Sequence, residues 1–328
     1  MRVLNEKDYR LLERLVSLSQ AEVHRAMVQY LKAKYDNNVI ITKDYIIAIG
    51  DIPIALVAHM DTVFKTPVSD LYYDQRKGVL WSPQGIGGDD RAGIFAILKI
   101  LQEGFRPSVI LTTDEELGGV GACALVEAYP ECPIPGLKYM IELDRHGTND
   151  CVFYDCYCPE FVDYVESFGF CERWGSFTDI SFLMSEWDIV GVNLSVGYED
   201  EHSYTEILQI NPLFDTIRKV KEMLKEKDIP TFQYDELSIA ASAWWRRTSV
   251  YGQHCSKCKK LFSEYELIPV LGMDKTSKYF CPDCLVGNVE WCDNCGEAFE
   301  VKEPSAERIC KICAEDLCTA KSKNNLEK

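Results

Sequence analysis

The chain has 328 residues, 47% of them hydrophobic, and a net charge of −17. This length allows one large domain and a small one, and the acidic balance argues against nucleic-acid binding by the whole surface. We predict no signal peptide and no membrane-spanning segment, because no apolar run has the required place or length. Most of the 15 cysteines form late CxxC pairs, which is metal-binding spacing, so we expect a cytoplasmic protein.

Apolar periodicity predicts alternating helices and strands over residues 1–228. Two N-terminal helices come first, and Ser19 with Glu22 gives the second a capping-box start. A hairpin follows at 38–50. Further strands are predicted at 52–61, 108–113, 137–143, 151–156 and 189–197, and helices at 91–101, 119–129, 159–168 and 211–227. This alternation predicts an α/β domain with a mixed, mostly parallel sheet that has helices on both faces.

Potential metal ligands stand at the ends of the apolar strands or at the starts of helices. They occur in five segments, which contain His59 and Asp61, Asp89 and Asp90, Glu115 and Glu116, Glu142 and Asp144, and His202. In an open α/β sheet the ligand site lies beyond the carboxyl ends of the strands. Taken singly, the segments have ordinary explanations as helix caps or solvated loops. Their joint occurrence predicts a two-metal site of zinc, manganese or cobalt.

The motifs resemble those of the co-catalytic dinuclear zinc exopeptidases. This group includes the T-type tripeptidases, the glutamate carboxypeptidases with their deacylase relatives, and the compact zinc aminopeptidases. LVAHMDTV matches their H-x-D-T-V, GIGGDDRAGI is close to G-A-D-D-K-A-G, and LTTDEELGGVGA is close to T-x-D-E-E-x-G-x-G-A. Asp144 and His202 correspond to the later ligands of the group by order and strand context. The resemblance covers about residues 5–226.

The resemblance implies a role for each of these residues. The metal ligands would be His59 and Asp144 on one ion, Glu116 and His202 on the other, and Asp89 as the bridge. Glu115 would be the general base acting on a metal-bridging water, and Asp61 would orient His59. In this group the peptide bond between the two residues that correspond to Asp89 and Asp90 is often cis.

The chain differs from the lidded members of the group. His59 and Asp89 are 30 positions apart (89 − 59), and Asp144 and His202 are 58 apart (202 − 144). Core strands and helices fill the second interval and the first is short, so we predict no lid, and the lid histidine that would assist the oxyanion is missing. The candidates for that role, for substrate contact or for support of the site are Asp90, Arg145, His146, Asp179 and Tyr198. For Asp179 a helix cap is the ordinary alternative.

The C-terminal part is rich in cysteine. Its four CxxC pairs are Cys255 and Cys258, Cys281 and Cys284, Cys292 and Cys295, and Cys310 and Cys313. Four thiolates bind one tetrahedral zinc ion, so we predict two structural zinc sites, each with four cysteine ligands, in a zinc-ribbon module. The module would span 254–318, after a connector at 229–253 and before a flexible tail at 319–328. We expect sequential pairing, in which the first two CxxC pairs bind one ion and the last two pairs bind the other. A cross-braced arrangement is the alternative.

Three functions follow from these observations. The first is a metal-dependent exopeptidase, aminopeptidase-like, that acts on short peptides and carries an accessory zinc ribbon. The second is a deacylase or amidohydrolase of a small N-acyl compound. The third is a protein whose zinc ribbons bind a protein or nucleic-acid partner and whose hydrolase domain is vestigial. The presence of Glu115 weighs against the third, since a relic has no need of a base.

Overall fold

The computed structural model describes residues 4–36, 38–154, 156, 158–175, 177–235, 253–262, 267–271, 277–285, 288–291 and 298–301. The chain divides into two compact units, Met1–Glu236 and Leu237–Lys328. Among the described residues, no helix is both long and apolar enough to cross a membrane.

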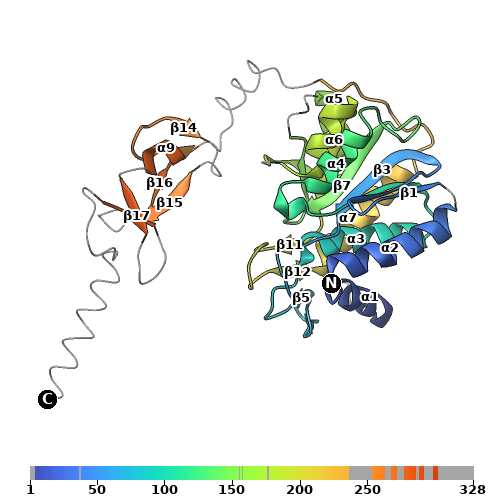
Figure 1. Ribbon diagram of the computed structural model, residues 1–328, viewed down its shortest axis with the longest axis horizontal. Coiled ribbons are helices and arrows are strands. Elements are labelled where there is room, and N and C mark those ends of the chain that lie inside the picture. The colour runs from blue at the N-terminus through green and yellow to red at the C-terminus, as the bar shows by residue number, and fades with distance from the viewer. Residues whose placement is uncertain are drawn as a thin grey trace. The chain divides into compact units, whose positions relative to one another are not determined.

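An eight-stranded sheet forms the centre of the first unit (Figure 1). Its strands are, in spatial order, β1 (Val39–Ile41), β2 (Tyr45–Ala48), β6 (Pro107–Thr112), β3 (Ile52–His59), β7 (Tyr139–Arg145), β10 (Gly191–Ser195), β8 (Asp150–Val152) and β9 (Cys171–Glu172). The central strands β6, β3, β7 and β10 are parallel, whereas β2 and β8 pair with them in the antiparallel sense. The predicted mixed, mostly parallel sheet is therefore confirmed.

Helices cover both faces of this sheet, as predicted (Figure 1). On one face lie α3 (Gly88–Gln102) and α7 (Ile210–Leu224), and on the other α4 (Val120–Ala128) and α6 (Asp179–Trp187). The remaining helices are α1 (Glu6–Val16), which packs on α3, α2 (Gln20–Tyr35), which packs on β1 and β2, and α5 (Pro159–Ser167). The predicted cap of α2 is present, because the Glu22 carboxylate accepts the Ser19 backbone N–H at 3.0 Å.

The topology brings the ends of three strands together. From β3 the chain continues to β6 on one side, and from β6 it continues to β7 on the other side of β3. The carboxyl ends of these parallel neighbours therefore share one edge, where the connections diverge. A divergence of this kind is where open α/β sheets bind their ligands.

The first unit also contains a smaller antiparallel sheet that the sequence analysis did not predict. Its strands are, in spatial order, β11 (Tyr198–Glu199), β12 (Ile207–Gln209), β5 (Val79–Trp81) and β4 (Tyr72–Asp74). The pairing of β12 with β5 holds the loop at 200–206 next to the segment that leads into α3. This sheet therefore positions His202, which stands in that loop.

One predicted strand is shorter than expected. The prediction covered 151–156, whereas β8 ends at Val152. Tyr154 has a left-handed backbone, with φ of 52°, which a strand does not accommodate. The prediction was wrong here because apolar periodicity does not report a reversal of φ.

The second unit is built from short strands. The described elements are β13 (Gln253–His254), β14 (Leu261–Phe262), β15 (Ile268–Leu271), β16 (Ser277–Phe280), α9 (Pro282–Leu285), β17 (Val289–Trp291) and β18 (Ala298–Glu300). β13 pairs with β14, and β15 to β18 form a separate four-stranded sheet. Two small groups of buried side chains make its described core, Cys255 with Leu267 and Cys281, and Val270 with Phe280.

Candidate metal centre

His59 is the last residue of β3 and is fully buried. Its Nε2 lies 2.9 Å from Asp89 Oδ1 and 3.5 Å from Asp144 Oδ1. Its Nδ1 lies 3.1 Å from Asp61 Oδ1. One ring nitrogen is thus held by Asp61 and the other faces two carboxylates, which is the arrangement of a metal-binding histidine with a supporting acid.

A second group lies on the other side of Asp89. His202 Nε2 is 3.1 Å from Asp89 Oδ2 and 3.0 Å from Glu116 Oε2. In each group the three ligand atoms lie within 4.8 Å of one another. Within the described residues Glu116 Oε1 is buried without a hydrogen-bond partner, as an oxygen reserved for an ion would be. Asp89 therefore directs one oxygen at each of two imidazole–carboxylate groups, and this donor set fits two divalent ions.

Glu206 fixes the backbone around Asp89, and sequence reasoning missed it. Its buried carboxylate accepts the Gly87 N–H at 2.9 Å and the Asp89 N–H at 3.0 Å. Burial raises the pKa of Glu206 to about 8. The peptide bond between Asp89 and Asp90 is cis. The sequence offered one weak signal, an acid four positions after His202.

The start of α3 explains the residues that follow Asp89. Asp90 Oδ1 accepts the Gly93 N–H at 2.8 Å, so this carboxylate supports the first helical turn. A Cβ on Gly93 would lie 2.2 Å from the Leu143 carbonyl oxygen, which only glycine avoids. Arg91 is buried and donates to the carbonyls of Met60 and Leu18. These contacts tie α3 to the ends of β3 and β7.

Asp61 links the two sides of the site. Besides His59 Nδ1, it accepts the backbone N–H groups of Glu115 and Glu116, each at 3.1 Å. Those two residues open the short 3-10 helix η1 (Glu115–Leu117), which follows β6. A single carboxylate therefore positions a ligand of one group and the turn that carries Glu116 of the other.

Asp144 lies near the end of β7 and is held from several directions. Its backbone N–H donates to Asn193 Oδ1 at 2.9 Å, and Asn193 Nδ2 donates back to its carbonyl at 2.8 Å. The Tyr198 hydroxyl donates to Oδ1 at 3.0 Å, and the Thr178 hydroxyl donates to Oδ2 at 3.2 Å. Tyr198, a candidate for substrate contact, is thus hydrogen-bonded to Asp144, a proposed metal ligand.

The site concentrates negative charge. Burial, and then the neighbouring Asp144, Asp179 and Asp89, raise the pKa of Glu115 to about 9. Burial also raises the pKa of Asp144 to about 7. Hydrogen bonds to Asp89 and Glu116 raise the pKa of His202 to about 11. These shifts show carboxylates that lack compensating positive charge, which two divalent cations would supply.

Two more acids are buried beside the centre. Glu142 in β7 is 0% exposed, and neither carboxylate oxygen has a hydrogen-bond partner in the described part of the chain. Burial raises its pKa well above the ordinary value, which favours the neutral acid. Asp179, the first residue of α6, is fully buried and accepts the Thr112 hydroxyl. Thr178, and not Asp179, is the N-cap of that helix.

A cavity of about 300 Å³ opens over both groups. It is lined by Asp89, Glu115, Glu116, Asp144, Arg145, His146, Tyr154, Gly175, Phe177, Thr178, Asn193, Tyr198, Glu201 and His202. Of the five candidates for substrate contact or support, Arg145, His146 and Tyr198 are in this lining. His146 Nδ1 lies 2.6 Å from Glu201 Oε1. A second cavity of about 430 Å³, lined partly by Val63, Phe64 and Ile86, shares Glu116 with the first.

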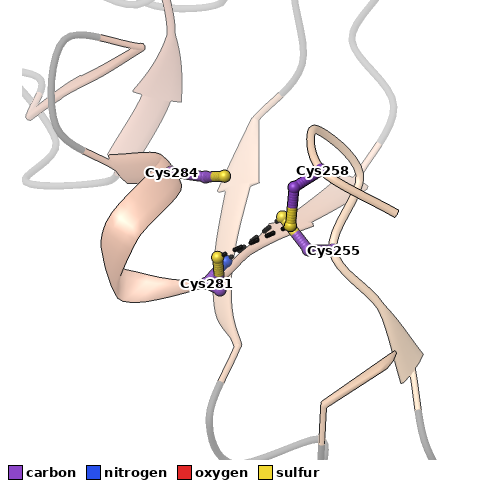
Figure 2. A group of neighbouring side chains, drawn as sticks. All are labelled: Cys255, Cys258, Cys281 and Cys284. Atoms are coloured by element: carbon purple, nitrogen blue, oxygen red, sulfur yellow. Dashed lines mark hydrogen bonds between the residues drawn. The ribbon is translucent and has the colours of Figure 1, made fainter. Parts of the chain in front are cut away.

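Four cysteines of the second unit converge (Figure 2). Cys255 and Cys258 come from the turn between β13 and β14, and Cys281 and Cys284 flank the start of α9. Their sulfur atoms lie within 4.8 Å of one another, and Cys258 Sγ is 3.9 Å from Cys281 Sγ. Although burial alone would raise the pKa of Cys255, backbone N–H groups lower it to about 6, which favours the thiolate. These are the first two CxxC pairs, as sequential pairing predicts.

The other predicted cysteine ligands, Cys292, Cys295, Cys310 and Cys313, lie outside the described residues. The predicted tail at 319–328 and most of the connector at 229–253 lie outside them too.

No protein-family model and no curated protein matches this sequence. Solved structures do match it. A tripeptidase from Staphylococcus aureus aligns with a TM-score of 0.54 at 14% identity, over 68% of this chain and 99% of its own. A TET aminopeptidase from a Thaumarchaeota archaeon aligns with a TM-score of 0.53 at 15% identity, over 68% of this chain and 97% of its own. The first unit has the fold of these peptidases. The resemblance carried by the motifs is thereby confirmed at the level of the fold, which does not by itself fix an activity.

Proposed function

We propose that the first unit is a two-metal hydrolase that removes residues from the end of short peptides, in the manner of an aminopeptidase. The observation that carries this proposal is the position of Asp89. One of its oxygens faces His59 and Asp144, and the other faces His202 and Glu116. A carboxylate shared by two imidazole–acid groups is the donor arrangement that a pair of catalytic divalent ions requires.

The residues present suit zinc best, with manganese or cobalt as alternatives. His59 and Asp144 would hold one ion, Glu116 and His202 the other, and Asp89 would bind both. When bound, such a pair polarises the carbonyl of the scissile bond and acidifies a water molecule.

Glu115 is the proposed general base. Its carboxylate lines the cavity beside both ligand groups, and it is absent from both. It can therefore take the proton of the attacking water and pass it to the leaving amine without losing a ligand role. Divalent ions bound beside it would favour its ionised form and oppose the effect of burial on its pKa.

The four converging cysteines of the second unit are proposed to bind a structural zinc ion, and the remaining two CxxC pairs a second one. A partner of this module, whether protein or nucleic acid, stays a prediction from the sequence.

The test is an assay panel with zinc-, manganese- or cobalt-loaded full-length protein. Aminoacyl amides, dipeptides, tripeptides and N-acyl amino acids would be compared, and we expect release of the N-terminal residue from short peptides. Glu115→Gln should lower kcat on the order of a hundredfold or more while the metal content is unchanged. Glu127→Gln is the matched control, because it makes the same change on an exposed part of α4. The proposal fails if no substrate is cleaved with any metal, or if Glu115→Gln is fully active.

A further inference from the structure

Arg145 is the last residue of β7 and directly follows Asp144. It lines the cavity over the metal centre. Its guanidinium donates one hydrogen bond, from Nη2 to the Trp174 carbonyl at 3.3 Å. Its Nε is buried without a hydrogen-bond partner, and Arg145 forms no ion pair within the described residues. A cationic side chain therefore stands in the cavity wall without a charge partner among the residues that the structure describes.

Two other arginines and a histidine nearby have partners. Arg91 is buried and donates to two backbone carbonyls. His146, in the same cavity, lies 2.6 Å from a carboxylate oxygen of Glu201. Arg173 lies 3.7 Å from Asp150. Arg145 differs from these three because it lines the cavity and has neither an ion pair nor a second hydrogen bond within the described residues.

We propose that Arg145 binds a carboxylate of the substrate, so that the enzyme selects peptides with a free carboxylate close to the cleaved bond. This inference rests on the proposed peptidase function. A guanidinium offers parallel N–H donors that match the two oxygens of a carboxylate. The ligand is either the C-terminal carboxylate of a short peptide or an acidic side chain, since both present the same group.

The charges around the cavity strengthen this selection. Its wall also carries Asp89, Glu115, Glu116, Asp144 and Glu201. Bound ions would offset the acids at the metal centre, and the remaining acidic surface would repel a substrate carboxylate. Arg145 therefore defines the place in this wall where a carboxylate is attracted. A cavity of about 300 Å³ is at the small end for ligand sites, which suits a short peptide.

The experiment compares matched peptides on zinc-loaded full-length protein. The peptides are Leu-Gly-Gly, its C-terminal amide, and Leu-Asp-Gly amide; leucine leads each one because the neighbouring cavity is partly apolar. The variants are Arg145→Gln, Arg145→Lys and the control Arg173→Gln. Thermal unfolding of each variant checks that it is folded.

We expect the wild type to cleave the free acid with a kcat/KM about tenfold or more above that of the amide. Arg145→Gln should remove this preference, chiefly through KM for the acid, and leave the amide within about twofold. Arg145→Lys should be intermediate, because it keeps the charge and loses the planar fork. Arg173→Gln should behave as the wild type. If Leu-Asp-Gly amide matches the free acid, the side chain is an accepted source of the carboxylate.

A second readout does not need turnover. Calorimetry with Glu115→Gln, and with the Glu115→Gln/Arg145→Gln double variant, should show that tighter binding of the free acid depends on Arg145. Equal cleavage and equal binding of acid and amide by the wild type would overturn the inference. Equal loss on both peptides in Arg145→Gln would also overturn it, and would indicate a role at the oxyanion or in holding the Trp174 loop. If the wild type cleaves nothing, the proposed function fails, and the binding comparison still decides the role of Arg145.

Discussion

The two units of this chain hold their candidate metal ligands in opposite ways. In the first unit the ligands come from β3, the start of α3, the turn after β6, strand β7 and the loop between β11 and β12. A continuous apolar core supports those elements. In the second unit four thiols come from the turn between β13 and β14 and from the start of α9, and the described core is two small groups of side chains.

The two units should therefore differ in whether the metal depends on the fold or the fold depends on the metal. In the first unit the fold should create the site, because buried hydrogen bonds such as those of Glu206 and Asp61 position the ligands. In the second unit the metal should create the fold, because its described part buries little apolar surface to offset the loss of chain entropy. Each of the following experiments separates these two cases.

The largest expected effect is that of metal removal. A strong chelator should unfold the second unit and leave the first unit folded, although inactive. Hydrogen exchange read by mass spectrometry should show loss of protection in peptides from 253–262 and 277–285 and retained protection in β3 and β7. Cys281→Ser should reproduce the loss in the second unit, whereas Cys151→Ser, a buried cysteine of β8, should not. Protection of the second unit without zinc would contradict this prediction.

The next effect concerns Asp61. Asp61→Ala should weaken metal binding by about 10–100-fold, because a residue that supports a ligating histidine is lost. Asp61→Asn should be nearly as damaging, since its amide would turn an N–H towards a donor, either His59 Nδ1 or the Glu116 N–H. Competition with a zinc indicator measures the affinity, and Asp70→Asn, at an exposed position, is the control. Unchanged affinity in Asp61→Ala would remove Asp61 from the site.

A smaller effect is the pH dependence of metal binding by the first unit. Burial lowers the pKa of His59, but neighbouring carboxylates outweigh it and raise the pKa well above its ordinary value. Hydrogen bonds to Asp89 and Glu116 raise the pKa of His202 to about 11. These shifts favour the protonated rings when no metal is bound. Each must release its proton to bind an ion, and therefore rising pH should strengthen binding. The expected slope is about tenfold per pH unit for each ion, because one proton leaves each histidine. Asp144, with a pKa of about 7, adds to the slope near neutrality.

Calorimetry of zinc binding in two buffers with different ionisation enthalpies counts these protons. Binding that releases no protons between pH 6 and 8 would contradict this prediction.

The sequence predicted that the candidate ligands would lie together because of a simple geometric fact. His59 and Asp144 stand at the ends of apolar, parallel strands, and such ends share one edge of a sheet. The Glu115–Glu116 turn follows the next strand in the same way. Local pattern and strand direction together were enough to bring these residues to one place.

The features that the sequence did not predict depend on contacts between residues that are distant in sequence. Glu206 reaches Gly87 and Asp89 only because β12 pairs with β5, and strands of two or three residues leave no periodic signal. The left-handed Tyr154 ended a predicted strand for a reason that hydropathy does not encode. Arg145 was visible as a candidate, but its unmatched charge became apparent only with the positions of its neighbours.

The smallest expected effect is that of removing the second unit. Truncation after Glu236 should leave metal binding unchanged and activity on a small chromogenic amide within about twofold, because every proposed catalytic residue precedes the cut.

The residue at which the chain is cut affects the stability of the product. Phe232 packs on Phe161 with ring centroids 4.9 Å apart and on Tyr164 at 5.3 Å, so a truncation after Asp228 removes part of the first unit.

The shorter product should therefore melt at a lower temperature than the longer one, because it loses Phe232 together with Ile229 and Tyr234, which also pack on the core. Each of these side chains contributes at most about 3 kcal/mol. The two truncations form a matched pair that separates loss of this packing from loss of the zinc module. If the product that ends at Glu236 is insoluble or fails to bind catalytic metal, the independence of the two units is wrong. The thiolate-bound metal would then stabilise the first unit as well, and chelation should lower the protection of β3 and β7 in the exchange experiment.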